Sequence, residues 1–230
     1  MLNMKKIVVL SGAGMSAESG ILTFRDMGGM WDRYNIEEVA SPIAWVETPQ
    51  LVMDFYNTRR KQLLSVEPNK AHEALVELEK HYDVEIITQN VDDLHERAGS
   101  SNVLHLHGEL RKVRSEKDDN LVTELEGWKL KIGDLAEDGA QLRPHIVWFG
   151  EDVPLIDYAA ERVNLADILI IIGTSLSVYP AAGLMSCTTQ DCKTYYIDPK
   201  ANQQAIQDMV CISKKATIGV PKLVAELISK

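Results

Sequence analysis

The chain has 230 residues, of which 45% are hydrophobic, and its formal net charge is −10 at pH 7. This length suits one domain, or one large domain with a small insertion, and it is enough to bury a substantial core. The acidic balance argues against general affinity for the phosphate backbone of nucleic acids.

The apolar runs are too short to be targeting or membrane segments. Lys5 and Lys6 precede four apolar residues, fewer than the roughly 7–15 of a signal peptide. The run at 168–172 is far below the roughly 20 residues of a membrane span. We therefore expect a soluble, cytoplasmic protein with neither nucleic acid nor a membrane as a partner.

Short apolar or β-branched runs alternate with helical patterns along most of the chain. This alternation predicts an α/β fold with a doubly wound parallel sheet that is buried on both faces. Two inserts, 26–66 and 109–142, interrupt the pattern, and the first contains a helical stretch at 51–64. The expected strands are 6–10, 84–88, 103–106, 168–172, 194–197 and 210–213, and the other expected helices are 70–81, 155–165 and 221–228.

The first expected strand runs into small residues, with Gly12, Ala13 and Gly14 followed by Ser16. Such residues after a strand allow a tight turn, a close approach to a pyrophosphate, and a helix N-terminus whose N–H groups point at the phosphates. The segment predicts a dinucleotide-binding turn. No second strand with an acidic residue follows about 20 positions later, which disfavours an ordinary hydride-transfer enzyme.

Five ordered blocks of the chain resemble the sirtuins, the NAD-dependent protein-lysine deacylases. They are GAGMSAESGILTFRD at 12–26, TQNVDDLH at 88–95, HLHG at 105–108, RPHIVWFGE at 143–151 and GTSLSV at 173–178. The resemblance implies a Rossmann-like NAD-binding domain and a smaller domain made of the two inserts, with NAD and the acyl-lysine in the cleft between them. The large domain would comprise 1–25, 67–108 and 143–230, and the small domain the helical insertion 26–66 and the module 109–142.

The resemblance implies NAD as the cofactor. From the residues alone, helix N-capping is the favoured interpretation of Asn90 and Asp92, and a surface salt bridge is the alternative for Arg25. The family match favours NAD binding instead. Asp198 stands where sirtuins usually have Asn, and its carboxylate would accept from ribose hydroxyls but repel a 2′-phosphate, so NAD is expected in preference to NADP. The expected NAD-binding residues are Gly12, Ala13, Gly14, Ser16, Glu18, Phe24, Arg25, Trp31, Gln89, Asn90, Asp92, Gly173, Thr174, Ser175 and Asp198.

Catalysis is expected to depend on His107, with Asn90 as the second catalytic residue. A histidine pKa near 6.5 suits a general base at neutral pH. By resemblance, His107 deprotonates a ribose hydroxyl, and the products are nicotinamide and 2′-O-acyl-ADP-ribose. Strand alternation places His105 on the same face as His107, and His95 is a weaker rival, so only the His-Gly step of the motif favours His107.

A second group of residues concerns the acyl chain. Sirtuins that remove succinyl, malonyl or glutaryl groups carry Tyr-x-x-Arg on a helix, and here Tyr56 and Arg59 have that spacing, with the small Ala40 upstream. A guanidinium–carboxylate pair contributes about 1.5–3 kcal/mol, although an acetyl group would also fit. From the residues alone, 59–61 is equally a solvated basic face. The remaining expected substrate-binding residues are Val147, Phe149, Gly150, Glu151 and Val178.

Most sirtuins hold a structural zinc with two Cys pairs in the region that corresponds to 109–142. This interval contains neither Cys nor His, so a tetrahedral zinc site cannot be built there, and no metal is expected. The only cysteines are Cys187, Cys192 and Cys211, an odd number that gives no disulfide framework. We expect a small apolar cluster to replace the zinc, formed by Leu121, Val122, Leu125, Trp128, Leu130 and Ile132.

The expected activity is therefore NAD-dependent deacylation of acylated lysine side chains of proteins, for which the acidic surface is suited. Two alternatives remain open at this point. One is ADP-ribosyl transfer or NAD hydrolysis, and the other is a non-catalytic NAD-sensing module. The protein substrates, the preferred acyl group and the oligomeric state are not determined by the sequence.

Overall fold

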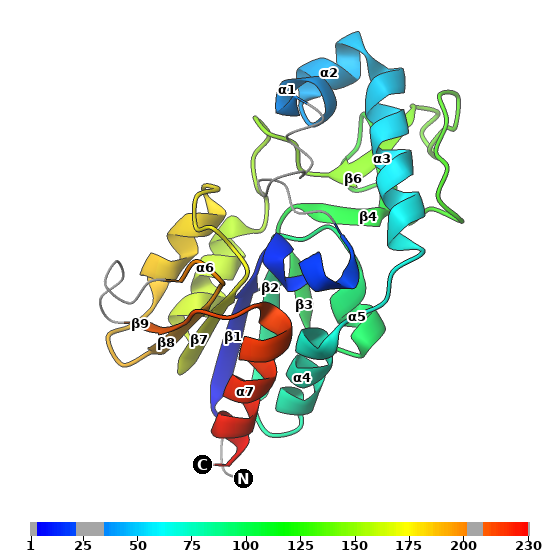
Figure 1. The fold of residues 1–230 in the computed structure, drawn as a ribbon. Coiled ribbons are helices and arrows are strands. Elements are labelled where there is room, and N and C mark those ends of the chain that lie inside the picture. Colours follow the sequence, from blue (N-terminus) through cyan, green and yellow to red (C-terminus); the bar gives the residue numbers. More distant parts are fainter. Residues whose placement is uncertain (1–3, 22–34, 202–208, 230) are drawn as a thin grey trace.

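The computed structural model describes residues 4–21, 35–201 and 209–229. Its larger part is a six-stranded parallel sheet in the order β3-β2-β1-β7-β8-β9, and a three-stranded antiparallel sheet, β5-β4-β6, forms a second, smaller part (Figure 1). The expected α/β fold with a doubly wound parallel sheet is confirmed. The strands are β1 (Lys6–Ser11), β2 (Asp83–Thr88), β3 (Val103–His105), β4 (Gly108–Ser115), β5 (Val122–Glu124), β6 (Leu142–Ile146), β7 (Ile168–Ile172), β8 (Lys193–Ile197) and β9 (Met209–Ile212).

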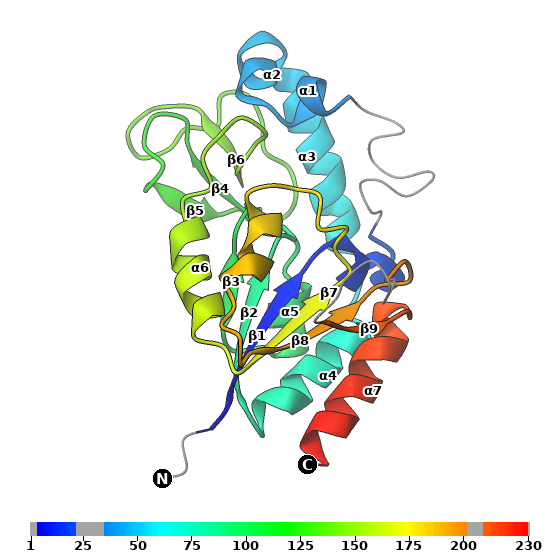
Figure 2. The ribbon, with the colours of Figure 1, turned by 90° about the vertical axis from the view of Figure 1, so that its left-hand side faces the viewer.

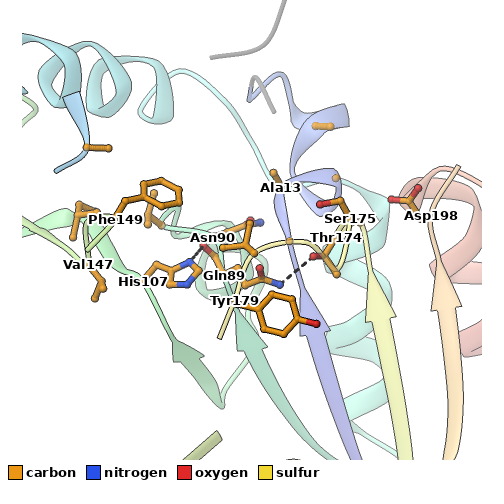
Figure 3. Close-up of a pocket in the computed structure, with 18 of the residues that line it drawn as sticks. Ala13, Gln89, Asn90, His107, Val147, Phe149, Thr174, Ser175, Tyr179 and Asp198 are labelled. Carbon is orange, nitrogen blue, oxygen red and sulfur yellow. Dashed lines mark hydrogen bonds between the residues drawn. The ribbon is translucent and has the colours of Figure 1, made fainter. Parts of the chain in front are cut away.

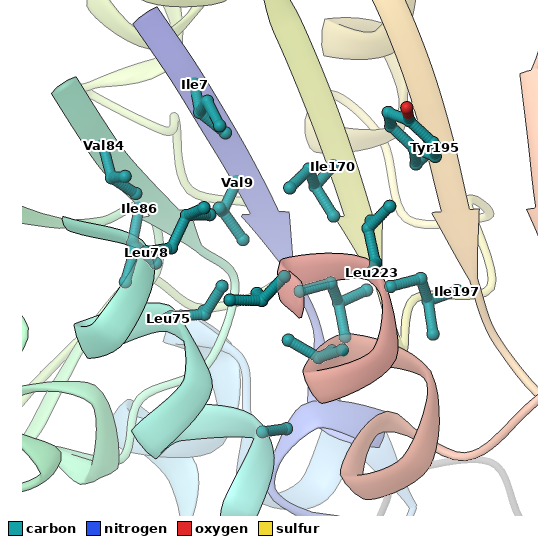
Figure 4. Packing of buried hydrophobic residues seen from close by; sticks show 14 of the residues in the cluster. Ile7, Val9, Leu75, Leu78, Val84, Ile86, Ile170, Tyr195, Ile197 and Leu223 are labelled. Carbon is teal, nitrogen blue, oxygen red and sulfur yellow. The ribbon is translucent and has the colours of Figure 1, made fainter. Parts of the chain in front are cut away.

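Both faces of the parallel sheet are covered, because alternate residues of its apolar strands point to opposite sides. Helices α4 (Lys70–Glu79) and α7 (Ala216–Ile228) pack on one face, where Val9, Ile170 and Leu223 belong to one buried cluster (Figure 4). Helix α6 (Ile156–Asn164) and the 3₁₀ segment η4 (Ala181–Cys187) cover the other face. The all-apolar strands are therefore buried on both sides, as expected.

The smaller part lies beyond the carboxyl ends of the parallel strands (Figures 1 and 2). It contains α1 (Ile36–Val39), α2 (Pro42–Glu47) and α3 (Pro49–Leu63), and α3 contacts β4 and β6. A separate buried cluster, which includes Trp45, Met53 and Trp148, fills the space between these elements. The division of the chain into domains at the residue bounds given above stays a prediction.

Two local expectations are wrong. The glycine turn leads into two short 3₁₀ helices, η1 (Ala13–Met15) and η2 (Ala17–Ser19), and not into a regular helix. β3 ends at His105, so His107 lies in the turn before β4 and does not share a strand face with His105. A further difference is that α7 begins before the expected helix and includes Pro221.

Two polar side chains of α3 are hydrogen-bonded to the segment 109–142. Asn57 and Arg60 are buried; Asn57 Nδ2 donates to the carbonyl of Leu130 over 2.8 Å, and Arg60 Nε donates to that of Leu110 over 2.7 Å. The solvated basic face considered for 59–61 is therefore wrong at Arg60. The expected apolar cluster is also wrong in part, because Leu130 is buried but Val122 and Ile132 are exposed.

Among the residues that the structure describes, no helix is both long and apolar enough to span a bilayer. Over the same residues, no group of three or more His, Cys, Asp or Glu side chains is arranged to hold a metal ion.

Candidate active site

A cavity of about 800 Å³ lies at the carboxyl edge of the parallel sheet, between this edge and the smaller part of the fold. The loops that follow β1, β2, β7 and β8 line one side of it, and α3 and the segment after β6 line the other. β1 lies between β2 and β7, so the chain order reverses beside it. Ligands of doubly wound sheets bind in the crevice at such a switch point.

The floor of the cavity is formed by two glycine turns in close contact. The Gly14 N–H donates to the carbonyl of Gly173 over 2.8 Å. A Cβ on Gly173, which has φ of +59°, would lie 2.5 Å from the backbone of Gly14 and Met15, so a side chain does not fit there. The N–H groups of Gly12, Gly14 and Met15 all donate within the protein. The expectation that this turn points a row of free N–H groups at phosphates is therefore wrong for these three.

Asn90 is held from three directions at the edge of the cavity. Its backbone N–H donates to Thr88 Oγ1 over 3.0 Å, and its carbonyl accepts from His105 Nδ1 over 3.0 Å. Its side-chain Nδ2 donates to Ser16 Oγ over 3.1 Å. Ser16 also hydrogen-bonds the Asp92 carboxyl, whose pKa is raised because it is buried. Ser16 and Asp92 thus lie behind Asn90 and orient it.

Asp92 is not the N-cap of α5 (Leu94–Ala98), which is Asp93, but it contacts the start of that helix. Asp92 Oδ1 accepts from the N–H of Leu94, the first residue of α5, over 3.3 Å. The carboxylate therefore fixes both the start of α5 and, through Ser16, the amide of Asn90.

His107 and His105 are distinguished by their partners. His107 Nδ1 is 3.1 Å from the carbonyl of Gln89, and because a carbonyl only accepts, Nδ1 carries the proton and Nε2 the lone pair. Burial lowers the pKa of His107 below 6.5, partly offset by this hydrogen bond. His107 is thus a neutral imidazole in the wall of the cavity (Figure 3).

His105 has the properties of a structural cation. Its Nδ1 donates to the carbonyl of Asn90 and its Nε2 lies 2.7 Å from Oε1 of Glu96. Burial opposes the charge, but the Glu96 carboxylate outweighs it and raises the pKa of His105 above 6.5. Both ring nitrogens donate, so His105 has no lone pair with which to act as a base.

Polar groups continue along the cavity toward β8. Gln89 Nε2 donates to Thr174 Oγ1 over 3.2 Å, and the Tyr196 hydroxyl donates to the carbonyl of Thr174 over 3.0 Å. Asp198 lies at the end of the cavity far from His107, with Ser175 between them (Figure 3). The polar lining is therefore long enough to contact a ligand at several separate points.

The opposite end of the cavity is more apolar. Val147 and Phe149 lie beside His107 (Figure 3), and the Val147 N–H donates to the His107 carbonyl over 3.0 Å. The Phe149 N–H donates to the carbonyl of Ala40 over 3.0 Å. These bonds tie the segment after β6 both to the candidate base and to α1.

Tyr56 and Arg59 enter this end of the cavity from α3. Tyr56 is buried, and its hydroxyl oxygen accepts from Trp148 Nε1 over 3.0 Å. Burial raises the pKa of Tyr56 to about 12. The Arg59 guanidinium lies 5.9 Å from the centre of the Tyr56 ring. The sequence expectation that both side chains share one helix face agrees with this arrangement.

Two expected ligand-binding carboxylates are engaged by neighbouring protein groups. Glu151 pairs with Arg143, with 2.8 Å between Oε1 and Nη1, and accepts from the Trp148 N–H over 2.7 Å. Glu18 accepts from the hydroxyl of Thr217 over 2.6 Å, which lowers the pKa of Glu18 although its burial acts in the opposite direction. Both carboxylates border the cavity but stabilise the surrounding loops.

The cavity thus gathers most of the residues expected from the sequence. Of these, Ser16 and Asp92 do not line it, and Phe24, Arg25 and Trp31 lie outside the described residues. The lining also includes Tyr179, Lys200 and Lys215, which carry no motif and come to the cavity only through the tertiary fold. The expected residues that line it are Gly12, Ala13, Gly14, Glu18, Ala40, Tyr56, Arg59, Gln89, Asn90, His107, Val147, Phe149, Gly150, Glu151, Gly173, Thr174, Ser175, Val178 and Asp198.

Comparison with known proteins decides the family. The family model described as the Sir2 family matches residues 12–180. The chain belongs to the Sir2 family. Its relatives include the "NAD-dependent protein deacylase" of Helicobacter pylori strain J99, which is 62% identical over 226 residues, covering 98% of this chain and 96% of the relative. The protein of the same name from Bacteroides thetaiotaomicron is 55% identical over 226 residues, covering 96% of this chain and 97% of the relative.

Solved structures of the Sir2 family have the same fold. A Sir2 homologue in complex with NAD has a TM-score of 0.87 and 42% sequence identity, covering 98% of this chain and 90% of that one. An ADP-ribose complex of a Sir2 homologue mutant has a TM-score of 0.90 at 42% identity, covering 98% and 93%.

The cavity of this Sir2-family chain fits NAD in size and in chemistry. Its volume of about 800 Å³ lies within the roughly 300–1,000 Å³ of ligand sites. Because Gly14 and Gly173 have no side chains, a ligand can come close to the backbone at the floor of the cavity. Along the lining, Asn90, Ser175 and Asp198 supply amide, hydroxyl and carboxylate groups as hydrogen-bond partners.

Proposed function

We propose that this chain uses NAD to remove acyl groups from lysine side chains of proteins. The observation that carries the proposal is the state of His107, a neutral imidazole whose Nδ1–H is held by the Gln89 carbonyl and whose Nε2 lone pair remains to accept a proton. It lies in a cavity large enough for NAD. The relatives named NAD-dependent protein deacylase support the same activity.

NAD, when bound, would supply a glycosidic bond whose cleavage releases nicotinamide and a sugar that accepts the acyl group. With one water consumed, the other products would be the free lysine amine and 2′-O-acyl-ADP-ribose. His107 takes a hydroxyl proton at Nε2, since its Nδ1 is already protonated. The Gln89 carbonyl stabilises the imidazolium that results, as a fixed acceptor for Nδ1–H. Asn90, oriented by Ser16, presents its amide to the cofactor beside this base.

Other residues of the lining bind and position the acyl-lysine and NAD. Val147 and Phe149 shield the region around His107 from water and contact the aliphatic part of the acyl-lysine. Asp198, at the far end, accepts from ribose hydroxyls and repels a 2′-phosphate, which favours NAD over NADP. Gly12, Gly14 and Gly173 permit close contact with the pyrophosphate. Phe24, Arg25 and Trp31 remain proposed cofactor residues on the sequence resemblance alone.

We also propose that acidic acyl groups, succinyl or malonyl, are substrates in addition to acetyl. Tyr56 and Arg59 reach the cavity from one face of α3, and the nearby Ala40 leaves space. The Tyr56 oxygen accepts from Trp148 Nε1, so its own O–H proton remains to donate to a ligand. A donor hydroxyl beside a guanidinium suits a carboxylate at the end of the acyl chain.

The central test is the His107→Ala variant. It should abolish formation of acyl-ADP-ribose from NAD and an acyl-lysine peptide, measured by mass spectrometry, while calorimetric NAD binding persists, because the base is needed only for proton transfer. His81→Ala, which changes an exposed histidine, is the matched control and should keep full activity. Wild-type activity in His107→Ala would disprove the assignment.

The same assay separates the two alternatives. Nicotinamide release without any acyl-peptide would indicate NAD hydrolysis or ADP-ribosyl transfer, and NAD binding without any turnover would indicate a sensing module. Release that requires the acyl-peptide supports the deacylase.

The acyl proposal is tested with Arg59→Met on succinyl- and acetyl-lysine peptides. Loss of the charge-assisted bond should lower kcat/KM for the succinyl peptide at least about tenfold, which corresponds to about 1.4 kcal/mol. Acetyl turnover should change little. Tyr56→Phe should act in the same direction but less strongly, because a neutral donor is lost. Equal losses on both peptides would show that the residues hold α3 in place and do not bind the acyl group.

A further inference from the structure

Two buried histidines lie outside the cavity and have no part in the proposed chemistry. His72, on α4, and His95, on α5, are both fully buried, and their ring centres are 4.9 Å apart with an interplanar angle of 66°. Burial lowers the pKa of His72 to about 4 and that of His95 well below 6.5. Both rings are therefore neutral at pH 7, and each has one protonated nitrogen.

The hydrogen-bond partners determine which nitrogen carries the proton. The backbone N–H of Asn69 donates to His72 Nδ1 over 3.2 Å, so Nδ1 holds the lone pair and Nε2 the proton. His95 Nε2 is 3.0 Å from Ser11 Oγ. Ser11 Oγ donates its own proton to Thr88 Oγ1 over 2.9 Å, so it accepts from His95, and the proton of His95 is also on Nε2.

The chain of hydrogen bonds ends at the active site. Thr88 Oγ1 accepts both from Ser11 Oγ and from the backbone N–H of Asn90, over 2.9 and 3.0 Å. Thr88 Oγ1 thus joins the Ser11 hydroxyl to the backbone of Asn90. The side chains of His95, Ser11 and Thr88 are all buried, where the loss of a hydrogen-bond partner is costly.

One nitrogen of each ring lies outside this chain of hydrogen bonds. His72 Nε2 and His95 Nδ1 are both buried without a hydrogen-bond partner among the described residues. With the protons placed as above, the first is a donor and the second an acceptor, on rings that meet edge to face. The His72 ring therefore packs against the His95 ring without a hydrogen bond between these two nitrogens.

We propose that His95 is a positioning residue, which acts through Ser11 and Thr88 to hold the backbone of Asn90. This rests on the role of Asn90 in the proposed function. The tautomer assignment itself depends only on the structure.

The tautomers are tested by ¹⁵N–¹H correlation spectra of the histidine rings at pH 7. Both His72 and His95 should be neutral and protonated at Nε2, with His72→Gln and His95→Gln used to assign the signals. A proton on Nδ1 of His95, or a charged His95 ring, would overturn the relay. This measurement needs no enzymatic activity.

The positioning role is tested with Thr88→Val and Thr88→Ser. Valine has the shape of threonine but no acceptor, so kcat at saturating NAD and acyl-peptide should fall at least about tenfold, while serine keeps the acceptor and should restore activity. Melting temperatures of both variants separate an effect on turnover from an effect on folding. Unchanged kcat in folded Thr88→Val would refute the proposal.

A double-mutant cycle identifies the connection to His95. His95→Phe should also lower kcat, and Thr88→Val added to it should cost little more, because both changes break the same chain. His95→Gln, which retains an N–H donor, should recover part of the loss. Fully additive effects would overturn the relay. A wild-type protein without deacylase activity would instead refute the proposed function, leaving the tautomer result as the test of the relay.

Discussion

Replacement of His72 by Gln should remove a defined part of the acid sensitivity of this protein. The unfolded chain binds the proton of His72 with a pKa near 6.5, whereas the folded chain binds it only near pH 4, because the ring is buried. Between these pH values the unfolded state holds more protons. Stability is therefore complete above about pH 6.5 and is lost as the pH falls toward 4.

The magnitude follows from these two pKa values, 6.5 and about 4. At 1.36 kcal/mol per pH unit, the His72 contribution lost by pH 4 is about 3 kcal/mol, of which about 2 kcal/mol is lost by pH 5. His95 is also depressed and acts in the same direction. Besides burial, the His72 ring is one cause of the lowered pKa of His95, so His72→Gln removes the His72 contribution together with the part of the His95 shift that His72 causes.

The assay is urea unfolding followed by circular dichroism at about pH 7.5 and pH 5. The loss of unfolding free energy between these pH values should be about 2 kcal/mol smaller in His72→Gln than in the wild type. His81→Gln, an exposed histidine close to the end of α4, is the control and should keep the wild-type loss. An identical pH dependence in wild type and His72→Gln would refute the reasoning.

Three further predictions concern the base, the small sheet and zinc. Since burial lowers the pKa of His107, the acid limb of the pH profile of kcat/KM should lie below pH 6.5. The His105→Gln variant should still show this limb. An acid limb above pH 6.5 would contradict a buried neutral base. Arg60→Met removes a buried donor to the Leu110 carbonyl and should lower the unfolding free energy by about 1–3 kcal/mol, whereas the exposed Lys61→Met should have little effect in the same denaturation experiment. Active protein should contain no stoichiometric zinc by metal analysis and should keep its activity in a chelator, because 109–142 has no Cys or His; stoichiometric zinc would disprove this.

Local patterns in the sequence determined most of the fold. Most of the parallel sheet consists of apolar or β-branched runs, as burial on both faces requires. An exception is the buried Glu85 of β2, which pairs with Lys6 and Arg162. The turns at Gly12 and Gly173 follow strands directly, so their place at the carboxyl edge was predictable. Five motifs in order identified the family, which the family model and the relatives confirm.

The tertiary structure alone decided the roles of individual polar side chains. The sequence offered His105 and His107 as rivals, and they differ only because Glu96 reaches one ring and the Gln89 carbonyl the other. Arg60 is adjacent to Lys61 in a basic stretch, yet it is buried because α3 turns it toward the carbonyl of Leu110.

The same holds for the residues behind the cavity. Ser16 and Asp92 were expected as ligands but lie behind Asn90, and Glu151 pairs with Arg143. These assignments depend on contacts between segments far apart in the chain. Local sequence determines which residues are apolar and where strands end, whereas the partner of a polar atom is determined only when distant elements pack together.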